Sequence, residues 1–589
     1  MMVDLKANPY YLSDEDCKWV EDTIEKMSDE EKVGQLFFQL TSSHDEEHLK
    51  ELMEKYHLGG CRYNPAKGKD IQEQNRILQS YAKIPIFIAC NTESGGDGAC
   101  TDGTYIASPV KIGASAKEEY AYELGRISNE EAKALGCNMA FAPVCDILLN
   151  WENTEVAMRA FGKNPEDVAK MSVAYLKGAH TVPEFACAAK HFPGNGIDFR
   201  DAHLSNNVNL LSPEEWERTY GMVYRTLIAN GLEAVMGGHI MLPEYEKAIN
   251  PHKKDNEIMP ATLSPEIMTG LLRERLGFNG MVVSDASHMV AMTNRMKRSE
   301  MLPAAIHAGC DMFLFFNDPD EDYDTMLRAW KTRRISEERM REALMRILGL
   351  KAHLGLHKKK KEELVPSPEV LEQVLGKESY KKVQKEISRA GITLVKYKDK
   401  EVLPVTPGRY KRIMIVHVKG AEDGMSEFRK LLGLAGGNAA ELLKEKLCEK
   451  GFDAFIYESP LDRMKQKVAE GEKPSLNLYF AGKHAIADFK KDMDLVITLC
   501  DVPSGRPVFG MSKGGGEIPW YVYELPVVVI GCGQPTMLAD IPQARTYINT
   551  YDAKDFTLDA LVEKLMAGEE AFTGKDPIDS FCGLFDTRI

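Results

Sequence analysis

The sequence has little cysteine, no long apolar run and no excess of positive charge. Its 589 residues include only 12 cysteines and no Cys-x-x-Cys pair, which excludes a disulfide framework and a zinc knuckle. The net charge of −15 argues against a surface that binds nucleic acid or anionic lipid. No stretch approaches the roughly 18 consecutive apolar residues that a membrane-spanning helix needs.

The amino terminus also lacks the basic start and apolar run of a secretory signal, because residues 1–25 are polar and carry several acidic groups. Together with the few cysteines, this predicts a cytoplasmic protein. We expect no partner among nucleic acids or membranes, and the oligomeric state stays open.

Between residues 30 and 320, short apolar runs typical of buried strands alternate with charge-rich, amphipathic stretches. The runs are Val33–Leu40, Gly59–Tyr63, Ile84–Ala89, Met139–Val144, Ala186–Ala189, Ala234–Gly238, Gly280–Ser284 and Asp311–Phe316. Helix-start signals lie between them, such as Ser28 with Glu31, and Pro213 after a serine. Eight such units over about 300 residues predict an α/β fold, with a closed (β/α)8 barrel of the TIM type over residues 1–350.

The composition changes at residues 351–384, which contain the lysine run 358–361 and few strand formers, so we expect a linker there. Strand-like runs then return at Ile413–Val418, Phe452–Tyr457, Leu495–Leu499 and Val527–Ile530. A helical stretch over Ala439–Lys450 separates the first two. These patterns predict a smaller αβα sandwich domain over residues 385–589, and the glycine-rich segment 510–517 is expected to be a surface loop.

Polar residues follow several of the predicted barrel strands, at the strand ends where this fold places its chemistry. They are Asn91 and Glu93 after the third run, Asp146 after the fourth, Lys190 and His191 after the fifth, His239 after the sixth, and Asp285 after the seventh. Taken singly, each ending has an alternative reading as part of a polar loop. Taken together, they indicate a site at one rim of the barrel.

The densest polar cluster is the segment Lys190–His203, whose glycines and proline predict a loop over the barrel mouth. Within it, Asp201 stands two residues before His203. The carboxylate can then hold one ring nitrogen and leave the other free for proton transfer, which suits acid and base roles. The alternative is a loop held together by a local Asp–His hydrogen bond.

Asp285 ends an apolar strand, where an ionised carboxylate can attack an electrophilic carbon. The alternative is a carboxylate that caps the following helix. Arg159, Lys190 and His191 offer hydrogen-bond donors to a polyhydroxylated ligand such as a sugar. For each of these three, a salt bridge that holds the barrel rim is the alternative reading.

Five segments resemble, in their order and spacing, the signature of glycoside hydrolase family 3. They are Glu31–Leu36, Phe141–Asp146, Arg159–Gly162, Lys190–Gly194 and Ser284–Met289. The Asp201-x-His203 loop is similar to that of the β-N-acetylglucosaminidase branch, whereas the β-glucosidase branch takes its acid from a glutamate of a later domain. The resemblance covers residues 28–350 and extends into the region after residue 385.

The resemblance implies a retaining, exo-acting β-N-acetylglucosaminidase that removes terminal amino sugars from small β-glycosides, such as fragments of peptidoglycan or chitin. It implies that Asp285 is the nucleophile, His203 the general acid/base and Asp201 its orienting partner. The sugar would be bound by Asn91, Glu93, Arg159, Lys190 and His191. No metal or organic cofactor is implied.

The chain departs from the family pattern at three positions. Asn91 stands where the hexosaminidases carry a sugar-binding aspartate, which puts the identity of the sugar at its fourth or sixth carbon in doubt. Asn195 replaces a histidine and Ala202 a serine, both expected to be loop adjustments. Three other functions stay open: a phosphorylase that uses phosphate in place of water, a family 3 glycosidase with another sugar specificity, and a sugar-binding protein without turnover.

Overall fold

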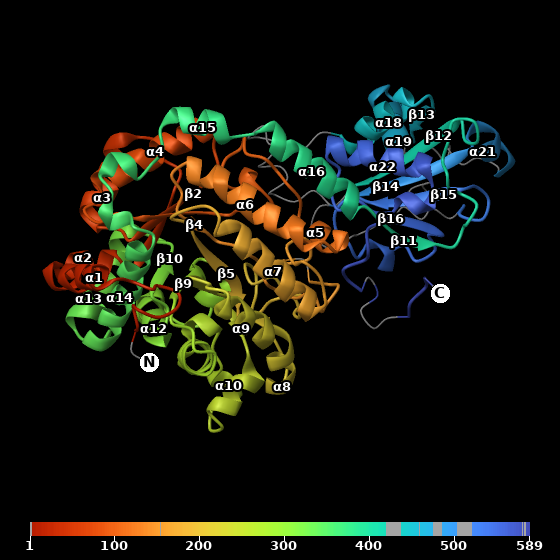
Figure 1. Ribbon diagram of the computed structural model, residues 1–589. Helices are drawn as coiled ribbons and strands as arrows, with labels where there is room; N and C mark the ends of the chain where they lie inside the picture. The colour runs from red at the N-terminus through yellow and green to blue at the C-terminus, as the bar shows by residue number, and fades with distance from the viewer. Residues whose placement is uncertain are drawn as a thin grey trace. The chain divides into compact units, whose positions relative to one another are not determined.

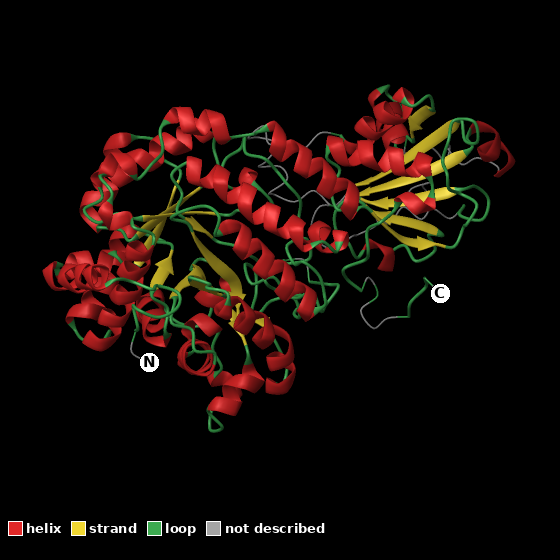
Figure 2. Ribbon diagram, in the orientation of Figure 1, coloured by secondary structure: helices red, strands yellow, loops and turns green. Residues whose placement is uncertain are grey.

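The computed structural model describes residues 3–153, 155–419, 438–458, 460–474, 486–502, 521–579, 581 and 585–588. The chain forms two compact units, each built around its own sheet (Figures 1 and 2). Unit 1 comprises Met1–Pro109 and Lys117–Gln384, and unit 2 comprises Val110–Ala116 and Lys385–Ile589. The predicted loop at residues 510–517 lies outside the described residues.

Unit 1 is a closed barrel of parallel strands in the order β1-β10-β9-β7-β5-β4-β3-β2. The strands are β1 (Phe37–Thr41), β2 (Gly60–Tyr63), β3 (Phe87–Cys90), β4 (Met139–Ala140), β5 (Ala186–Phe192), β7 (Ala234–Gly237), β9 (Met281–Ala286) and β10 (Met312–Leu314). Each of the eight predicted runs overlaps one of these strands, so the predicted (β/α)8 barrel is confirmed. The short strands β6 (Asn207–Val208) and β8 (Ile240–Met241) pair outside the barrel.

Helices surround the barrel sheet, as Figure 2 shows. They are α1 (Asp14–Lys26), α2 (Asp29–Gly34), α3 (Glu46–Tyr56), α4 (Gly68–Tyr81), α6 (Glu118–Ala134), α7 (Pro165–Ala179), α8 (Pro213–Trp216), α9 (Met222–Ala229), α10 (Pro243–Ile249), α11 (Val290–Thr293), α12 (Arg298–Ala308), α13 (Pro319–Lys331), α14 (Glu337–His353) and α15 (Pro368–Val374). Helix α16 (Glu378–Gly391) begins in unit 1 and ends in unit 2. Two π-helical segments, Glu217–Gly221 and Glu266–Arg275, complete the set.

The first barrel strand begins later than the apolar run suggests. Ser28 Oγ accepts a hydrogen bond from the Glu31 backbone at 3.2 Å, and the Glu31 carboxylate accepts one from the Ser28 backbone at 2.9 Å. This capping box starts helix α2, and Val33 lies on the buried face of that helix. The strand therefore starts at Phe37 rather than at Val33.

The segment 351–384 is largely helical and lies against the outer helices of unit 1. Its backbone carbonyls at Pro366 and Ser367 accept hydrogen bonds from Arg76 (3.1 Å) and Gln72 (3.2 Å) of α4. The backbone N–H of Gly376 donates to Glu131 of α6 at 2.8 Å. The segment therefore wraps over the outside of the barrel.

Unit 2 is a six-stranded sheet in the order β11-β16-β15-β14-β12-β13, in which only β11 is antiparallel to its neighbour. The strands are β11 (Thr393–Tyr397), β12 (Arg412–Lys419), β13 (Asp453–Ile456), β14 (Leu495–Asp501), β15 (Val527–Gly531) and β16 (Thr546–Asn549). Its helices are α5 (Pro109–Ser115), α18 (Ala439–Glu449), α19 (Pro460–Ala469), α21 (Ile486–Asp492) and α22 (Asp555–Ala567). The predicted αβα sandwich is confirmed, with β11 and β16 in addition to the four predicted strands.

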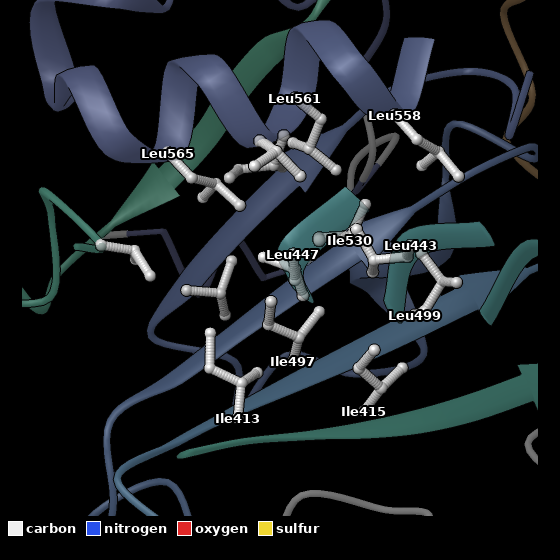
Figure 3. Packing of buried hydrophobic residues seen from close by; sticks show 14 of the residues in the cluster. Ile413, Ile415, Leu443, Leu447, Ile497, Leu499, Ile530, Leu558, Leu561 and Leu565 are labelled. Carbon is white, nitrogen blue, oxygen red and sulfur yellow. The ribbon is translucent and has the colours of Figure 1, made fainter. Parts of the chain in front are cut away.

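Alternate residues of the central strands face the two sides of this sheet. Ile413 and Ile415 of β12 belong to one buried cluster, and Met414 and Val416 belong to another. Figure 3 shows the first cluster, where leucines of α18 and α22 lie against the isoleucines of the strands. Both faces are covered, which is why these strands read as continuous apolar runs.

Helix α5 lies between two barrel elements in the sequence but belongs to unit 2. Its Lys111 side chain is fully buried, and the ammonium donates to Ser388 (2.7 Å), Asp552 (2.8 Å) and Thr557 (3.0 Å). Burial lowers the pKa of Lys111, against the opposing charge of Asp552. Because a buried ion needs a partner, this ion pair ties α5 into unit 2.

Replacing Lys111 tests this tie. Lys111→Met keeps the side-chain length but leaves Asp552 without its buried cation, so we expect the free energy of unfolding to fall by about 3–5 kcal/mol in a denaturant titration. Lys117→Met is the matched control, because its pair with Glu119 is exposed and spans 3.9 Å; the expected loss is below about 1 kcal/mol. Equal losses in the two variants would contradict the assigned role.

Candidate active site

The predicted site residues gather at the carboxyl-terminal rim of the barrel. Glu93 follows β3, Lys190 and His191 lie in the last part of β5, and Asp285 lies in the last part of β9. Because all strands of a closed parallel barrel end at the same rim, segments far apart in the sequence meet there. Arg159 joins them from the segment that follows β4.

Glu93 is held between two cations. Its carboxylate accepts from Arg159 Nε (2.7 Å) and Nη2 (2.9 Å), a two-point contact, and from Lys190 Nζ (2.5 Å). Burial alone would raise the pKa of Glu93, but the charges and hydrogen bonds of Arg159 and Lys190 hold it well below its usual range. Burial lowers the pKa of Lys190, against the opposing charge of Glu93. The three side chains form one connected group, in which a single carboxylate holds two cations.

His191 is oriented by Asp146, the residue that follows the predicted fourth strand. The His191 Nδ1 lies 2.7 Å from Asp146 Oδ2, and the backbone N–H groups of His191 and Asn195 donate to Asp146 Oδ1 at 3.2 and 2.8 Å. The carboxylate is therefore the acceptor and Nδ1 carries the proton. His191 Nε2 lies 3.3 Å from Arg159 Nη2, where it acts as acceptor.

Asn195, which stands where the family pattern has histidine, organises the loop after β5. Its side-chain oxygen accepts from Asn153 (3.1 Å), Gly196 (2.7 Å) and Asn207 (3.3 Å). Its backbone carbonyl accepts a hydrogen bond from Tyr220 at 2.6 Å. The asparagine thus supports the loop.

Asp285 is held in its ionised form. Burial would raise the pKa of Asp285, but the positive charges that His191 and His239 carry when protonated, the Ala286 backbone N–H and the Lys190 charge lower it below its ordinary value. The Ala286 N–H donates to Asp285 Oδ1 at 2.7 Å. Among the described residues no hydrogen bond reaches Oδ2, which leaves that oxygen available to a ligand.

His239 supports this position from the segment that follows β7. Its Nδ1 lies 2.7 Å from Thr262 Oγ1 and its Nε2 lies 3.1 Å from the Ala286 carbonyl oxygen. Since a carbonyl only accepts, Nε2 carries a proton. Burial lowers the pKa of His239, which keeps the ring neutral at this place.

Asp201 and His203 form the predicted pair. The Asp201 Oδ1 lies 2.7 Å from His203 Nδ1 and accepts from the His203 backbone at 2.8 Å. The hydrogen bond that His203 donates to Asp201 raises the pKa of His203 against the effect of burial, and the charges of Glu155 and Asp285 act in the same direction. The imidazole is 52% exposed, so Nε2 remains accessible.

The loop that carries this pair is fastened to the chain just beyond Asp285. The backbone N–H groups of Val290 and Ala291 donate to the carbonyls of His203 (3.3 Å) and Ala202 (3.1 Å). The Ala202 methyl packs in a small buried cluster with Met289 and Ala291. A serine hydroxyl at position 202 would lie in this apolar contact, which accounts for the alanine.

Glu155, Asp201 and His203 are the group in the described part of the chain whose ligand atoms lie close enough for a metal ion, within 4.8 Å of one another. These atoms already take part in hydrogen bonds: Asp201 with His203, and Glu155 with the Ala202 backbone at 3.2 Å. Hydrogen bonding alone accounts for the cluster.

The family model of the glycosyl hydrolase family 3 N terminal domain matches residues 28–350, more than half of the chain. The chain belongs to glycoside hydrolase family 3. A curated family 3 relative from Cellulomonas fimi, a beta-N-acetylglucosaminidase/beta-glucosidase, is 35% identical over 591 residues that cover 100% of both chains. The predicted family and the predicted class, a glycoside hydrolase that acts on O-glycosyl bonds, are confirmed.

Two solved structures extend the comparison. The beta-glucoside phosphorylase BglX is 35% identical, with a TM-score of 0.87 over 99% of this chain and 99% of that chain. A glycoside hydrolase family 3 beta-N-acetylglucosaminidase from Paenibacillus has the same fold, at 23% identity, with a TM-score of 0.76 over 94% of this chain and 99% of that chain. Within the described residues, every helix falls short of the length or the hydrophobicity needed to cross a bilayer.

The Asp146–His191 pair yields a test. In Asp146→Asn the amide can present its NH2 to His191 Nδ1, which moves the ring proton to Nε2, facing the Arg159 guanidinium. We expect kcat/KM for the best nitrophenyl glycoside to fall about 10- to 100-fold, since a hydrogen bond to a charged group contributes about 1.5–3 kcal/mol. Nitrogen NMR of the histidine reports the tautomer. The exposed Asp320→Asn is the control; an unchanged His191 tautomer would contradict the assignment.

Proposed function

We propose that this family 3 enzyme is a retaining, exo-acting β-N-acetylglucosaminidase on small β-glycosides. The observation that carries the proposal is the Asp201–His203 pair, with Nδ1 held at 2.7 Å and the loop bonded to the segment directly after Asp285. His203 can serve as a proton donor, and its loop is bonded to the chain a few residues after the ionised carboxylate of Asp285. The name of the Cellulomonas fimi relative supports an amino-sugar substrate, and equally includes glucosides.

In the proposed reaction, the uncommitted oxygen of Asp285 attacks the anomeric carbon while the glycosidic carbon–oxygen bond breaks. His203 gives its Nε2 proton to the departing oxygen, and Asp201 stabilises the imidazolium that precedes this transfer. In the second step, His203 takes a proton from water as the water oxygen attacks the anomeric carbon and Asp285 leaves. Two displacements at one carbon return the sugar with its original β configuration.

Sugar hydroxyls would be bound by Arg159, Lys190 and His191 on one side of the pocket, with Glu93 fixing the first two. Asn91 presents an amide where the family pattern has a carboxylate, so it both donates and accepts. These side chains are partly or fully buried and pre-positioned, so binding orders few of them.

A phosphorylase is the second candidate. The likeness to the solved beta-glucoside phosphorylase, at 35% identity and a TM-score of 0.87, favours it. The chemistry is compatible, because an imidazole that has just lost its proton is neutral and repels incoming phosphate less than a carboxylate would. Phosphate oxygen would then take the place of water, and the product would be the sugar 1-phosphate.

A substrate panel tests the function. Nitrophenyl β-glycosides of glucose, galactose and N-acetylglucosamine are incubated with the enzyme, with and without phosphate, and the products are followed by proton NMR. We expect the N-acetylglucosaminide to react fastest and to release free sugar that is first seen as the β anomer. Formation of sugar 1-phosphate in proportion to phosphate would establish the phosphorylase instead. If the glucoside reacted faster than the N-acetylglucosaminide, the proposed sugar specificity would be wrong. Saturable binding of the glycosides without any product would exclude an enzyme of this type.

The raised pKa of His203 predicts a pH effect. The first step needs protonated His203, so kcat/KM for a poor leaving group falls as the pH rises through the pKa of His203 in the free enzyme. Because the Asp201 hydrogen bond and charge raise that pKa, Asp201→Asn lowers it and moves the alkaline limb to lower pH. The acidic limb reports Asp285, whose pKa is lowered by other groups, and stays in place as an internal control. An alkaline limb that does not move would refute the assignment of His203 as acid.

A further inference from the structure

Arg62, in β2, is a charged residue at the barrel rim to which the predicted site assigns no role. Its backbone lies in register with Leu40 of β1 and Ala89 of β3. The ring of Phe38 in β1 lies 5.6 Å from that of Phe141, with two strands between them, so Phe38 and its register partner Gly60 face the barrel interior. Side chains alternate along a strand, so Arg62, two residues after Gly60, also faces the interior, near the carboxyl end of β2. The charges of Glu93 and Asp285 oppose the lowering of the pKa of Arg62 by burial.

The guanidinium of Arg62 has no partner: among the described residues, no hydrogen bond or ion pair reaches it. Glu93, the nearer candidate, is already used by Arg159 and Lys190, which contact both of its oxygens. An arginine keeps its charge in proteins and offers five N–H donors in one plane. Its donors are therefore available to a ligand that enters the barrel mouth.

A ligand of Arg62 must bring oxygen acceptors into the carboxyl-terminal mouth of the barrel, where Glu93 and Asp285 also lie. Glu93 belongs to the group proposed to hold sugar hydroxyls, and Asp285 is proposed to face the anomeric carbon. A glycone that spans these two carboxylates places its ring substituents next to the guanidinium. Contact with Asp285 itself would give a direct ion pair, and no such pair is present.

We propose that Arg62 is a sugar-binding residue that donates hydrogen bonds to one oxygen substituent of the glycone and thereby determines which sugar is accepted. The inference rests on the proposed function, because it takes the glycone to lie over Asp285. It adds a binding residue from a strand that contains none of the family motifs described above. The donor set around the glycone is then formed by β2 as well as by the segments that follow β3, β4 and β5.

The test uses the whole enzyme and substrates that lack one oxygen at a time. Arg62→Met removes the donors and keeps the length of the side chain, and Arg62→Lys keeps the charge. With the best nitrophenyl glycoside, we expect Arg62→Met to lower kcat/KM about 10- to 100-fold. With the deoxy analogue that lacks the bound oxygen, the difference between wild type and Arg62→Met should shrink to less than about threefold. Arg76→Met, on the outer surface of α4, is the matched control and should leave both values unchanged.

The outcomes separate the two proposals. Wild-type turnover of the N-acetylglucosaminide tests the proposed function, whereas the pattern over the deoxy analogues tests Arg62 with whichever sugar reacts best. If Arg62→Met lowered kcat/KM equally for every analogue, or lowered it for none, the proposed role of Arg62 would be wrong. A change confined to the KM of inorganic phosphate would also overturn it. Thermal unfolding of each variant shows whether it is folded, and if Arg62→Met does not fold, Arg62→Lys provides the same comparison.

Discussion

Pairing of opposite charges governs the arrangement of the barrel rim. Ions that are largely removed from water need partners, and the rim supplies them in fixed groups: Glu93 with two cations, and Asp146 with His191 and two backbone N–H groups. The same rule applies deeper in the barrel, where Asp311 accepts from three buried or nearly buried arginines. Asp285, His203 and Arg62 differ from these groups because each keeps at least one polar atom without a hydrogen bond from the described residues, and the proposed reaction uses all three.

The barrel was largely predictable from the sequence, because strands buried on both faces leave continuous apolar runs. The errors have local causes. Val33 lies in a helix since the Ser28 capping box starts it. β11 and β16 in unit 2 were not predicted, because β11 has mostly partly exposed residues and includes Lys396, and β16 is only four residues long and is bounded by Thr546 and Asn549. Their pairing is antiparallel and joins residues far apart in the sequence, which no local pattern records.

The site shows the same division. Short-range pairs, such as Asp201 with His203, follow from spacing, and the strand endings indicated which residues meet at the rim. What spacing cannot show is which partner each group takes: that Glu93 holds Arg159 and Lys190, that Asp146 sets the tautomer of His191, or that Asn195 holds a loop. A role for Arg62 could not be predicted from the sequence, because Arg62 lies inside an apolar run and a single charge there is also typical of the end of a strand.

The membership of residues 110–116 in unit 2 has a consequence for how this chain is made and how it diversified. These residues leave the ribosome well before residue 385, so the Lys111 side chain waits for its buried partners until most of the polypeptide has been synthesised. Unit 2 is therefore formed by two separate segments of the sequence. A recombination event that brought in only the carboxyl-terminal part would arrive without its own helix, so gain or exchange of this unit requires coordinated change at two separate places in the gene.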